Sequence, residues 1–159
     1  MPEQYRAATA ADIPALVALS DQRRQHYAQY QPVFWRPVAD ARERHEPFLR
    51  SLLTQDNVIA RVHERGDGTV DGFVIATLVP APPVYDPGGL TCGIDDFCID
   101  DASDWPTIGK RLLADVMAEA KTRGASQVVV VCGHLDQPKR TMLAAAGLTI
   151  ASEWYVRPL

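Results

Sequence analysis

The chain has 159 residues, of which 47% are apolar, and its formal charge at pH 7 is −4. This apolar content excludes disorder, and a chain of this length forms one domain that buries roughly 68–70% of its unfolded surface without crosslinks. No apolar run approaches the roughly 18 residues of a membrane span, and the first residues lack the features of a signal peptide. We expect one cytoplasmic domain over residues 1–159 that does not enter a membrane.

The cysteines and histidines lack the spacing that metal or redox chemistry requires. The three cysteines, Cys92, Cys98 and Cys132, are odd in number and form no C-x-x-C pair, which favours a reducing compartment. None of the four histidines is spaced as a metal ligand. We therefore expect no metal.

Charge is unevenly distributed along the chain. Residues 66–109 carry eight acids and no base, whereas residues 110–159 carry seven bases and four acids. An acidic chain without a basic stripe is a poor nucleic-acid binder, because phosphate contacts supply most of that affinity. The acidic middle favours a cationic small molecule, and a solvated acidic face is the alternative for each acid taken singly.

The predicted elements begin with a strand at residues 4–8 and a helix that Thr9 caps. Two prolines and two large aromatic residues interrupt the helical pattern at residues 31–37, and a second helix resumes near Ala39. Later elements are a hairpin of strands 58–63 and 70–79, a stiff proline-rich loop 80–89, a strand 90–99, a helix 105–123, a buried parallel strand 127–132, a helix 136–146 and a last strand 149–157.

This order predicts one βαβ crossover, from strand 90–99 through the following helix to strand 127–132. The expected fold class is α/β of the mixed α+β kind, with a central, mostly antiparallel sheet of about six strands and helices on both faces. A doubly wound dinucleotide-binding domain is excluded, because repeated βα units and the G-x-G-x-x-G motif are absent.

The junction after Ile99 joins a strand to the N-terminus of a helix, where unpaired N–H groups and the helix dipole bind anions. Gly109 would let the backbone approach a ligand closely. Lys110 and Arg111 lie in the first turn, where each cation is unfavourable by about 0.3–1 kcal/mol unless an anion is present. Ordinary solvated side chains are the alternative explanation.

The chain resembles the GCN5-related N-acetyltransferase (GNAT) family over essentially its whole length. Residues 5–13 look like the opening strand and helix of that family, and the order of the elements is the same. Its members hold the pyrophosphate of acetyl-CoA in a loop of the form Arg/Gln-x-x-Gly-x-Gly/Ala. Residues 104–109 keep only the final glycine, with Asp104 and Thr107 at two other motif positions.

The resemblance implies acetyl-CoA as the cosubstrate and two further groups of cofactor contacts. Strand 90–99 would lend backbone groups to the pantetheine arm, and the helix from Asp136 would frame the cofactor. Leu143 stands where the family often has a tyrosine as general acid, so a proton for the CoA thiolate would come from elsewhere or from water. The implied cofactor residues are Phe97, Cys98, Ile99, Thr107, Ile108, Gly109, Lys110, Arg111, Asp136, Lys139 and Arg140. For Asp136, capping the helix is the alternative.

Acyl transfer to an amine requires a group that receives the amine's proton. Asp95 and Asp96 lie in an otherwise apolar strand and, as neighbours, are expected on opposite faces, with Asp95 on the face of Phe97 and Ile99. We expect one of the two acids to be the base or the amine anchor. The alternative is that one of them pairs with an arginine of the N-terminal half.

Aromatic residues from the first helices and the proline-rich loop are candidates for an acceptor pocket, since aromatic rings attract cations. They are Tyr27, Tyr30, Phe34, Trp35 and Tyr85, and core packing is the alternative for each. The leading hypothesis is an acyl-CoA-dependent N-acetyltransferase in which a primary amine of a small molecule or peptide attacks the thioester directly. The competing hypotheses are a non-catalytic domain of the same fold that binds a metabolite or a partner protein, and a homodimeric scaffold in which a second copy covers a sheet edge.

Overall fold

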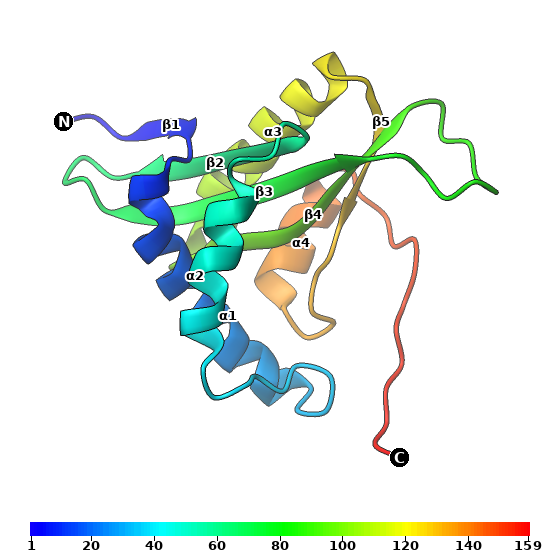
Figure 1. Ribbon diagram of the computed structural model, residues 1–159, viewed down its shortest axis with the longest axis horizontal. Helices are drawn as coiled ribbons and strands as arrows, with labels where there is room; N and C mark the ends of the chain where they lie inside the picture. Colours follow the sequence, from blue (N-terminus) through cyan, green and yellow to red (C-terminus); the bar gives the residue numbers. More distant parts are fainter.

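The computed structural model describes all residues from Met1 to Leu159 and contains a single central sheet with helices packed on both of its faces (Figure 1). The strands are β1 (Gln4–Ala7), β2 (Val58–Glu64), β3 (Val70–Val79), β4 (Leu90–Ile99) and β5 (Ala125–Val130), and the helices are α1 (Ile13–Tyr30), α2 (Ala41–Leu52), α3 (Lys110–Thr122) and α4 (Gln137–Ala145), with short helical turns η1 (Ala10–Asp12), η2 (Ala102–Asp104) and η3 (Trp105–Gly109).

The sheet has the order β1-β2-β3-β4-β5. The first four strands pair antiparallel, and β5 pairs parallel with β4 after the α3 crossover, which confirms the mixed sheet expected from the sequence. The sheet has five strands instead of about six, because residues 149–157 form no strand. The expected burial of β5 is also wrong: no strand pairs with its outer edge, and Val129 is exposed.

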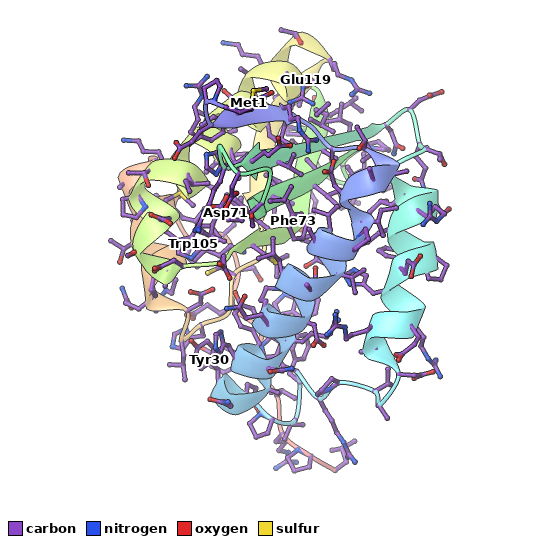
Figure 2. All side chains as sticks on the ribbon, turned by 90° about the vertical axis from the view of Figure 1, so that its left-hand side faces the viewer. Met1, Tyr30, Asp71, Phe73, Trp105 and Glu119 are labelled. Atoms are coloured by element: carbon purple, nitrogen blue, oxygen red, sulfur yellow. The ribbon has the colours of Figure 1, made fainter.

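Two hydrophobic layers hold the helices to the sheet. One layer joins α1 and α2 to the sheet through residues such as Leu16, Leu49 and Phe73. The other joins α3 and α4 to the opposite face through residues such as Leu112, Met142 and Phe97. Figure 2 shows this arrangement from the side, with Phe73 on the sheet beside α1 and Trp105 on the helical segment before α3. No helix is both long enough and apolar enough to cross a membrane.

The first helix begins as its sequence predicts. Thr9 and Asp12 form a capping box that starts the η1 turn, and α1 continues from it. Both oxygens of the Asp12 carboxylate also accept hydrogen bonds from Arg6 of β1, at 2.8 Å each. This pairing fixes the first strand to the first helix, and it holds the pKa of Asp12 below its usual value.

Candidate functional site

A β-bulge in β4 lies at the centre of the candidate site. In the ladder with β3, Ile94 pairs with Ala76 and Asp96 pairs with Ile75, so Asp95 has no partner. One extra residue shifts the alternation of side chains along the strand. Ile94 and Phe97 therefore lie in the same buried layer, while Asp95 is exposed. Asp95 therefore differs from Phe97 in exposure, and the sheet face that its side chain occupies stays a prediction.

Arg23 of α1 anchors the bulge to the helix layer. Its Nη1 donates to the carbonyl oxygen of Asp95 at 2.8 Å, and its Nη2 pairs with Oδ1 of Asp96 at 3.2 Å. The alternative that one of the two acids pairs with an arginine of the N-terminal half is thus confirmed for Asp96. The carboxylate of Asp95 makes no hydrogen bond or ion pair, so it is the one left available to a ligand.

Beyond the bulge, the outer edge of β4 is left open. The parallel ladder with β5 ends where Ile94 pairs with Val130, and the last bond across it runs from the Val131 N–H to the Ile94 carbonyl oxygen at 2.9 Å. From Asp96 to Ile99, β4 pairs with β3 alone. Backbone groups on this edge can therefore receive an extended ligand, as an added strand would.

A buried lysine lies against this open edge. Lys139 of α4 is 1% exposed, and its Nζ donates to the Phe97 carbonyl oxygen at 3.1 Å. The same ammonium lies 5.2 Å from the centroid of the Phe97 ring and 5.4 Å from that of Trp105. No carboxylate lies within 4.0 Å of it, since it forms no ion pair. Burial lowers the pKa of Lys139, and the nearby Arg23 cation lowers it further.

Tyr27 connects α1 to the start of α4. Its hydroxyl donates to Oδ2 of Asp136 at 2.6 Å and accepts from the Gly133 N–H at 3.2 Å. Burial, together with the Asp136 carboxylate, raises the pKa of Tyr27 well above its usual value. Oδ1 of Asp136 caps α4 by accepting from the Lys139 N–H at 3.4 Å, so Asp136 does have the capping role that was weighed as its alternative. A Cβ on Gly133 would lie 2.9 Å from the tyrosine ring, so glycine allows this contact.

These groups surround a cavity of about 150 Å³ between α1, the end of β4 and the start of α4. The cavity brings together two of the predicted acceptor residues and four of the predicted cofactor residues, namely Tyr27 and Tyr30 with Phe97, Cys98, Ile99 and Asp136. Figure 2 shows Tyr30 at the end of α1 and Trp105 on a neighbouring segment. The other lining residues were not predicted from the sequence; they are Leu19, Gln22, Arg23, His26, Asp100, Ala102, Trp105 and Pro138. Helical spacing could have found Arg23, because Arg23, Tyr27 and Tyr30 are spaced i, i+4, i+7.

The other predicted acceptor residues lie outside this cavity. Trp35 packs edge-on against Tyr27 with 5.1 Å between ring centroids, and Phe34 packs against Trp35 at 4.6 Å. The cluster therefore adjoins the cavity without lining it. Tyr85 is 71% exposed in the proline-rich loop and does not line the cavity either.

The strand-to-helix junction differs from the expected anion site. A Cβ on Gly109 would lie 2.5 Å from Cε3 of Trp105, so the missing side chain makes room for a buried ring instead of a ligand. The Lys110 N–H already bonds to the carbonyl oxygens of Trp105 and Thr107, because helical structure begins upstream at η2. The N-terminus of η2 is capped by Asp101, which accepts from the Ser103 N–H at 2.8 Å. The Lys110 amide, one of those expected to bind pyrophosphate, therefore already has hydrogen-bond partners in the helix.

The remaining cofactor candidates have separate surroundings. Ile108 is buried in the core, whereas Thr107 and Lys110 are exposed. Arg111 pairs with Asp115 at 3.0 Å, and its guanidinium lies 5.1 Å from the centroid of the Tyr5 ring, away from the cavity. Arg140 donates to the His134 carbonyl oxygen at 2.9 Å, beside the start of α4.

Solved structures of known proteins share this fold. A mutant protein from Bacillus halodurans has a TM-score of 0.82 at 15% identity, with 98% of this chain and 99% of that chain covered. A predicted acetyltransferase from Clostridium acetobutylicum, solved with acetyl-CoA, has a TM-score of 0.76 at 18% identity, with 98% and 96% covered. An aminoglycoside 6'-N-acetyltransferase from Acinetobacter baumannii has a TM-score of 0.72 at 12% identity, with 99% of each chain covered.

The fold is therefore that of the GNAT acetyltransferases, as the sequence resemblance implies. It comprises a mixed sheet, helices on both faces and one parallel crossover next to an opened strand edge. No protein-family model and no curated protein sequence matches the chain.

Proposed function

We propose that this protein is an N-acetyltransferase that transfers an acetyl group from acetyl-CoA to a primary amine of a small molecule or peptide. The observation that carries the proposal is the open edge of β4 after the Asp95 bulge, which lies beside an aromatic cavity. A GNAT-type fold that covers nearly the whole chain supports it. A fold alone does not specify a function, so the experiment that tests this proposal must change residues of the site.

The residues fit acetyl-CoA at the reactive end of the cofactor better than at its phosphates. The open edge of Phe97, Cys98 and Ile99 would receive the pantetheine arm, and Asp136 and Lys139 would border it from α4. Lys110 and Arg140 would reach the phosphates through their side chains, together with Thr107. In this arrangement Ile108 and Gly109 pack inside the core beneath the start of α3, and Arg111 lies beside Tyr5, away from the cavity.

Acetyl-CoA supplies an activated acyl group, and the chain supplies the proton acceptor. The carboxylate of Asp95 is exposed and unpaired beside the open edge, so it can take a proton from the attacking amine, directly or through a water molecule. Asp96 cannot move freely, because Arg23 holds it. Asp96 and Arg23 thus fix the bulge, and Asp95 is the base or the amine anchor of the proposal.

The acceptor is a cationic amine in this proposal. The cavity is lined by the rings of Tyr27, Tyr30 and Trp105, by the acidic residues Asp100 and Asp136, and by Arg23, whose charge is paired with Asp96. Aromatic faces and carboxylates both stabilise an ammonium group. The aminoglycoside N-acetyltransferase among the structural neighbours acts, by its name, on a small polyamine of this chemical class.

One observation favours a second candidate, a non-catalytic domain that binds a metabolite or a partner protein. The Phe97 carbonyl oxygen, on the edge proposed for pantetheine, is already occupied by the Lys139 ammonium. A cofactor that used this oxygen would have to displace the lysine. The two candidates differ in whether acetyl-CoA is consumed.

Calorimetric titration with acetyl-CoA, followed by an assay of CoA release over a panel of amines, tests the proposal. We expect binding, release of CoA with cationic acceptors, and a decrease in kcat of about 10²–10⁴-fold in Asp95→Asn if this residue is the direct base. Asp56→Asn, at an exposed residue outside the cavity, is the matched control. Binding without CoA release from any amine would refute the transfer step, and absence of acetyl-CoA binding would refute the proposal and support the non-catalytic candidate.

A further inference from the structure

The strand-to-helix junction after β4 has few backbone amides left for an anion. Anion binding at a helix N-terminus requires N–H groups that no other acceptor has taken. The Ser103 N–H donates to Oδ1 of Asp101 at 2.8 Å, and the Asp104 N–H donates to the Asp101 carbonyl oxygen at 2.9 Å. The Trp105 N–H bonds to a carbonyl oxygen of η2, and the Lys110 N–H bonds within η3. These four amides are therefore already satisfied inside the chain.

The other residues of the junction add little to this set. Pro106 has no N–H group, and Ile108 and Gly109 are buried. This leaves at most the amide of Thr107 among residues 103–110. A phosphate group is ordinarily held by several successive N–H groups together. The backbone of the junction therefore does not fit the pyrophosphate of CoA.

Charge at the junction also opposes an anion. Residues 100–110 contain three aspartates and one lysine. The N–H of Ser103 lowers the pKa of Asp101, so this carboxylate is charged at neutral pH. Arg65 approaches the acids of this segment, but its Nε is bonded to Asp71 at 2.5 Å. A phosphate group placed there would meet a net negative potential.

The open edge of β4 leads directly into this acidic segment. The cavity wall continues from Ile99 to Asp100, Ala102 and Trp105. At its other end the edge closes at Ile94, where the ladder with β5 ends. An extended ligand that continues along β4 therefore passes Ile99 and comes to the aspartates.

The basic side chains near the junction give only weak compensation. Lys110 is exposed, and Arg140 already donates to the His134 carbonyl oxygen at 2.9 Å. Arg111 is paired with Asp115. Exposed ion pairs contribute little to binding, because water and salt screen them. The nucleotide of CoA would thus gain little from these side chains.

The two halves of CoA differ in the properties that this surface separates. The pantetheine arm, which carries the acyl group, is a neutral extended chain with amide groups, and such a chain can pair with a strand edge. The nucleotide carries the phosphates. We propose that this protein recognises its acyl donor through the pantetheine arm alone, so that an acyl thioester of pantetheine without a nucleotide serves as well as acetyl-CoA.

This inference rests on the proposed acetyltransferase function and names the part of the donor that the site recognises. The transfer is the same with either donor. The amine nitrogen bonds to the acyl carbon, and the electron pair of the C–S bond goes to sulfur. The proton of the amine goes to Asp95 or to water, and the departing sulfur takes up a proton from water.

The test compares acetyl-CoA with S-acetylpantetheine as donors to the same amine. We expect the two values of kcat/KM to agree within about ten-fold, because a lost contact lowers kcat/KM only when it stabilises the transition state. A larger loss with S-acetylpantetheine overturns the inference. ADP, which carries a pyrophosphate without the arm, should not compete with pantetheine in calorimetric titrations, and competition by ADP also overturns it.

A variant tests whether the acids act on the nucleotide. Asp104 caps no helix with its side chain, so Asp104→Asn removes a charge without the loss of a cap. We expect it to lower the Kd of CoA by about two- to five-fold, the range of a single exposed charge, and to leave the Kd of pantetheine unchanged. Glu43→Gln, at an exposed acid on α2, is the matched control and changes neither value. Equal effects of Asp104→Asn on the two ligands would overturn the inference.

The outcomes separate this inference from the proposed function. Turnover of acetyl-CoA without turnover of S-acetylpantetheine overturns the inference and leaves the acetyltransferase proposal standing. If no amine of the panel is acetylated, the ratio of the Kd values of CoA and pantetheine decides the same question. Absence of binding of both ligands overturns the proposed function, and the inference falls with it.

Discussion

Asp95 and Asp96 are neighbours in the sequence, but their environments give them different roles. Asp95 is exposed on the bulge, and Asp96 is paired with the half-buried Arg23. The sequence pattern could narrow the candidate bases to this pair, and it could name an arginine as the alternative ion-pair partner of one of them. It could not say which acid is paired, because a bulge adds one residue to a strand without a change in composition.

Asp96→Asn is expected to lower the free energy of unfolding by about 1–3 kcal/mol, because hydrogen bonds to charged groups contribute this much and Arg23 would lose its ion partner. Asp95→Asn should change the free energy of unfolding by less than about 0.5 kcal/mol, as exposed substitutions usually do. Urea denaturation at neutral pH measures both values. Equal losses in the two variants would contradict the assignment of the ion pair.

The Tyr27 hydroxyl provides a prediction about alkaline pH. Its pKa is raised in the folded protein, so between the unfolded value of 10.0 and the folded one the native state keeps a proton that the unfolded state has lost. Stability is therefore fully present below about pH 10 and falls above it by up to about 1.4 kcal/mol per pH unit. Tyr27→Phe should be less stable at neutral pH, by about 1–2 kcal/mol, and its disadvantage should shrink above pH 10. Urea denaturation at pH 7 to 11 measures the free energy of unfolding of both proteins. A difference between them that stayed constant over this range would contradict the prediction.

At the scale of elements, most of the fold could be predicted from the sequence. The hairpin of β2 and β3 and the parallel crossover to β5 follow from turn residues and periodicity. Two local irregularities could not be predicted. The bulge in β4 and the π-helical turn η3 before α3 both arise where tertiary packing overrides the local period.

The η3 turn changes what a substitution at Gly109 does. The sequence predicts that a bulky residue there would block a ligand and leave the fold intact. The structure places the Trp105 ring against this glycine, so Gly109→Val should destabilise the protein by about 1–3 kcal/mol through overpacking. Thermal unfolding is compared with Ala114→Val, at an exposed position of the same helical segment, which should cost only about 0.5 kcal/mol. In the double variant with Gly109→Val, Trp105→Leu should recover part of the lost stability. Equal losses in Gly109→Val and Ala114→Val would contradict the explanation by overpacking.

At the scale of the whole molecule, the sheet ends in an open strand and the chain ends in an apolar tail. No strand pairs with the outer edge of β5, and Trp154 and Tyr155 in the tail are 82% and 89% exposed. Figure 1 shows the tail, in red, running past the sheet to the C-terminus. The alternating pattern at residues 149–157 predicts a strand, and a strand needs a neighbour to complete its hydrogen bonds.

A second copy of the chain would supply that neighbour, so we expect a homodimer that depends on the tail. Removal of residues 149–159 should give a monomer in sedimentation experiments. The free energy of unfolding of the monomer should change by less than about 0.5 kcal/mol, because the removed side chains are exposed. A wild-type chain that stays monomeric at every concentration would contradict the expectation.

The bulge at Asp95 has a consequence for insertions and deletions. Ile94, Asp96, Phe97 and Cys98 already occupy the alternating faces of a regular strand once Asp95 is left out of the count. Deletion of this one codon would therefore shorten the chain without turning any other side chain of β4 to the wrong side of the sheet. The fold therefore does not depend on Asp95, whereas the bulge beside the open edge does. One residue of chain length separates a regular strand β4 from a strand that carries the candidate site.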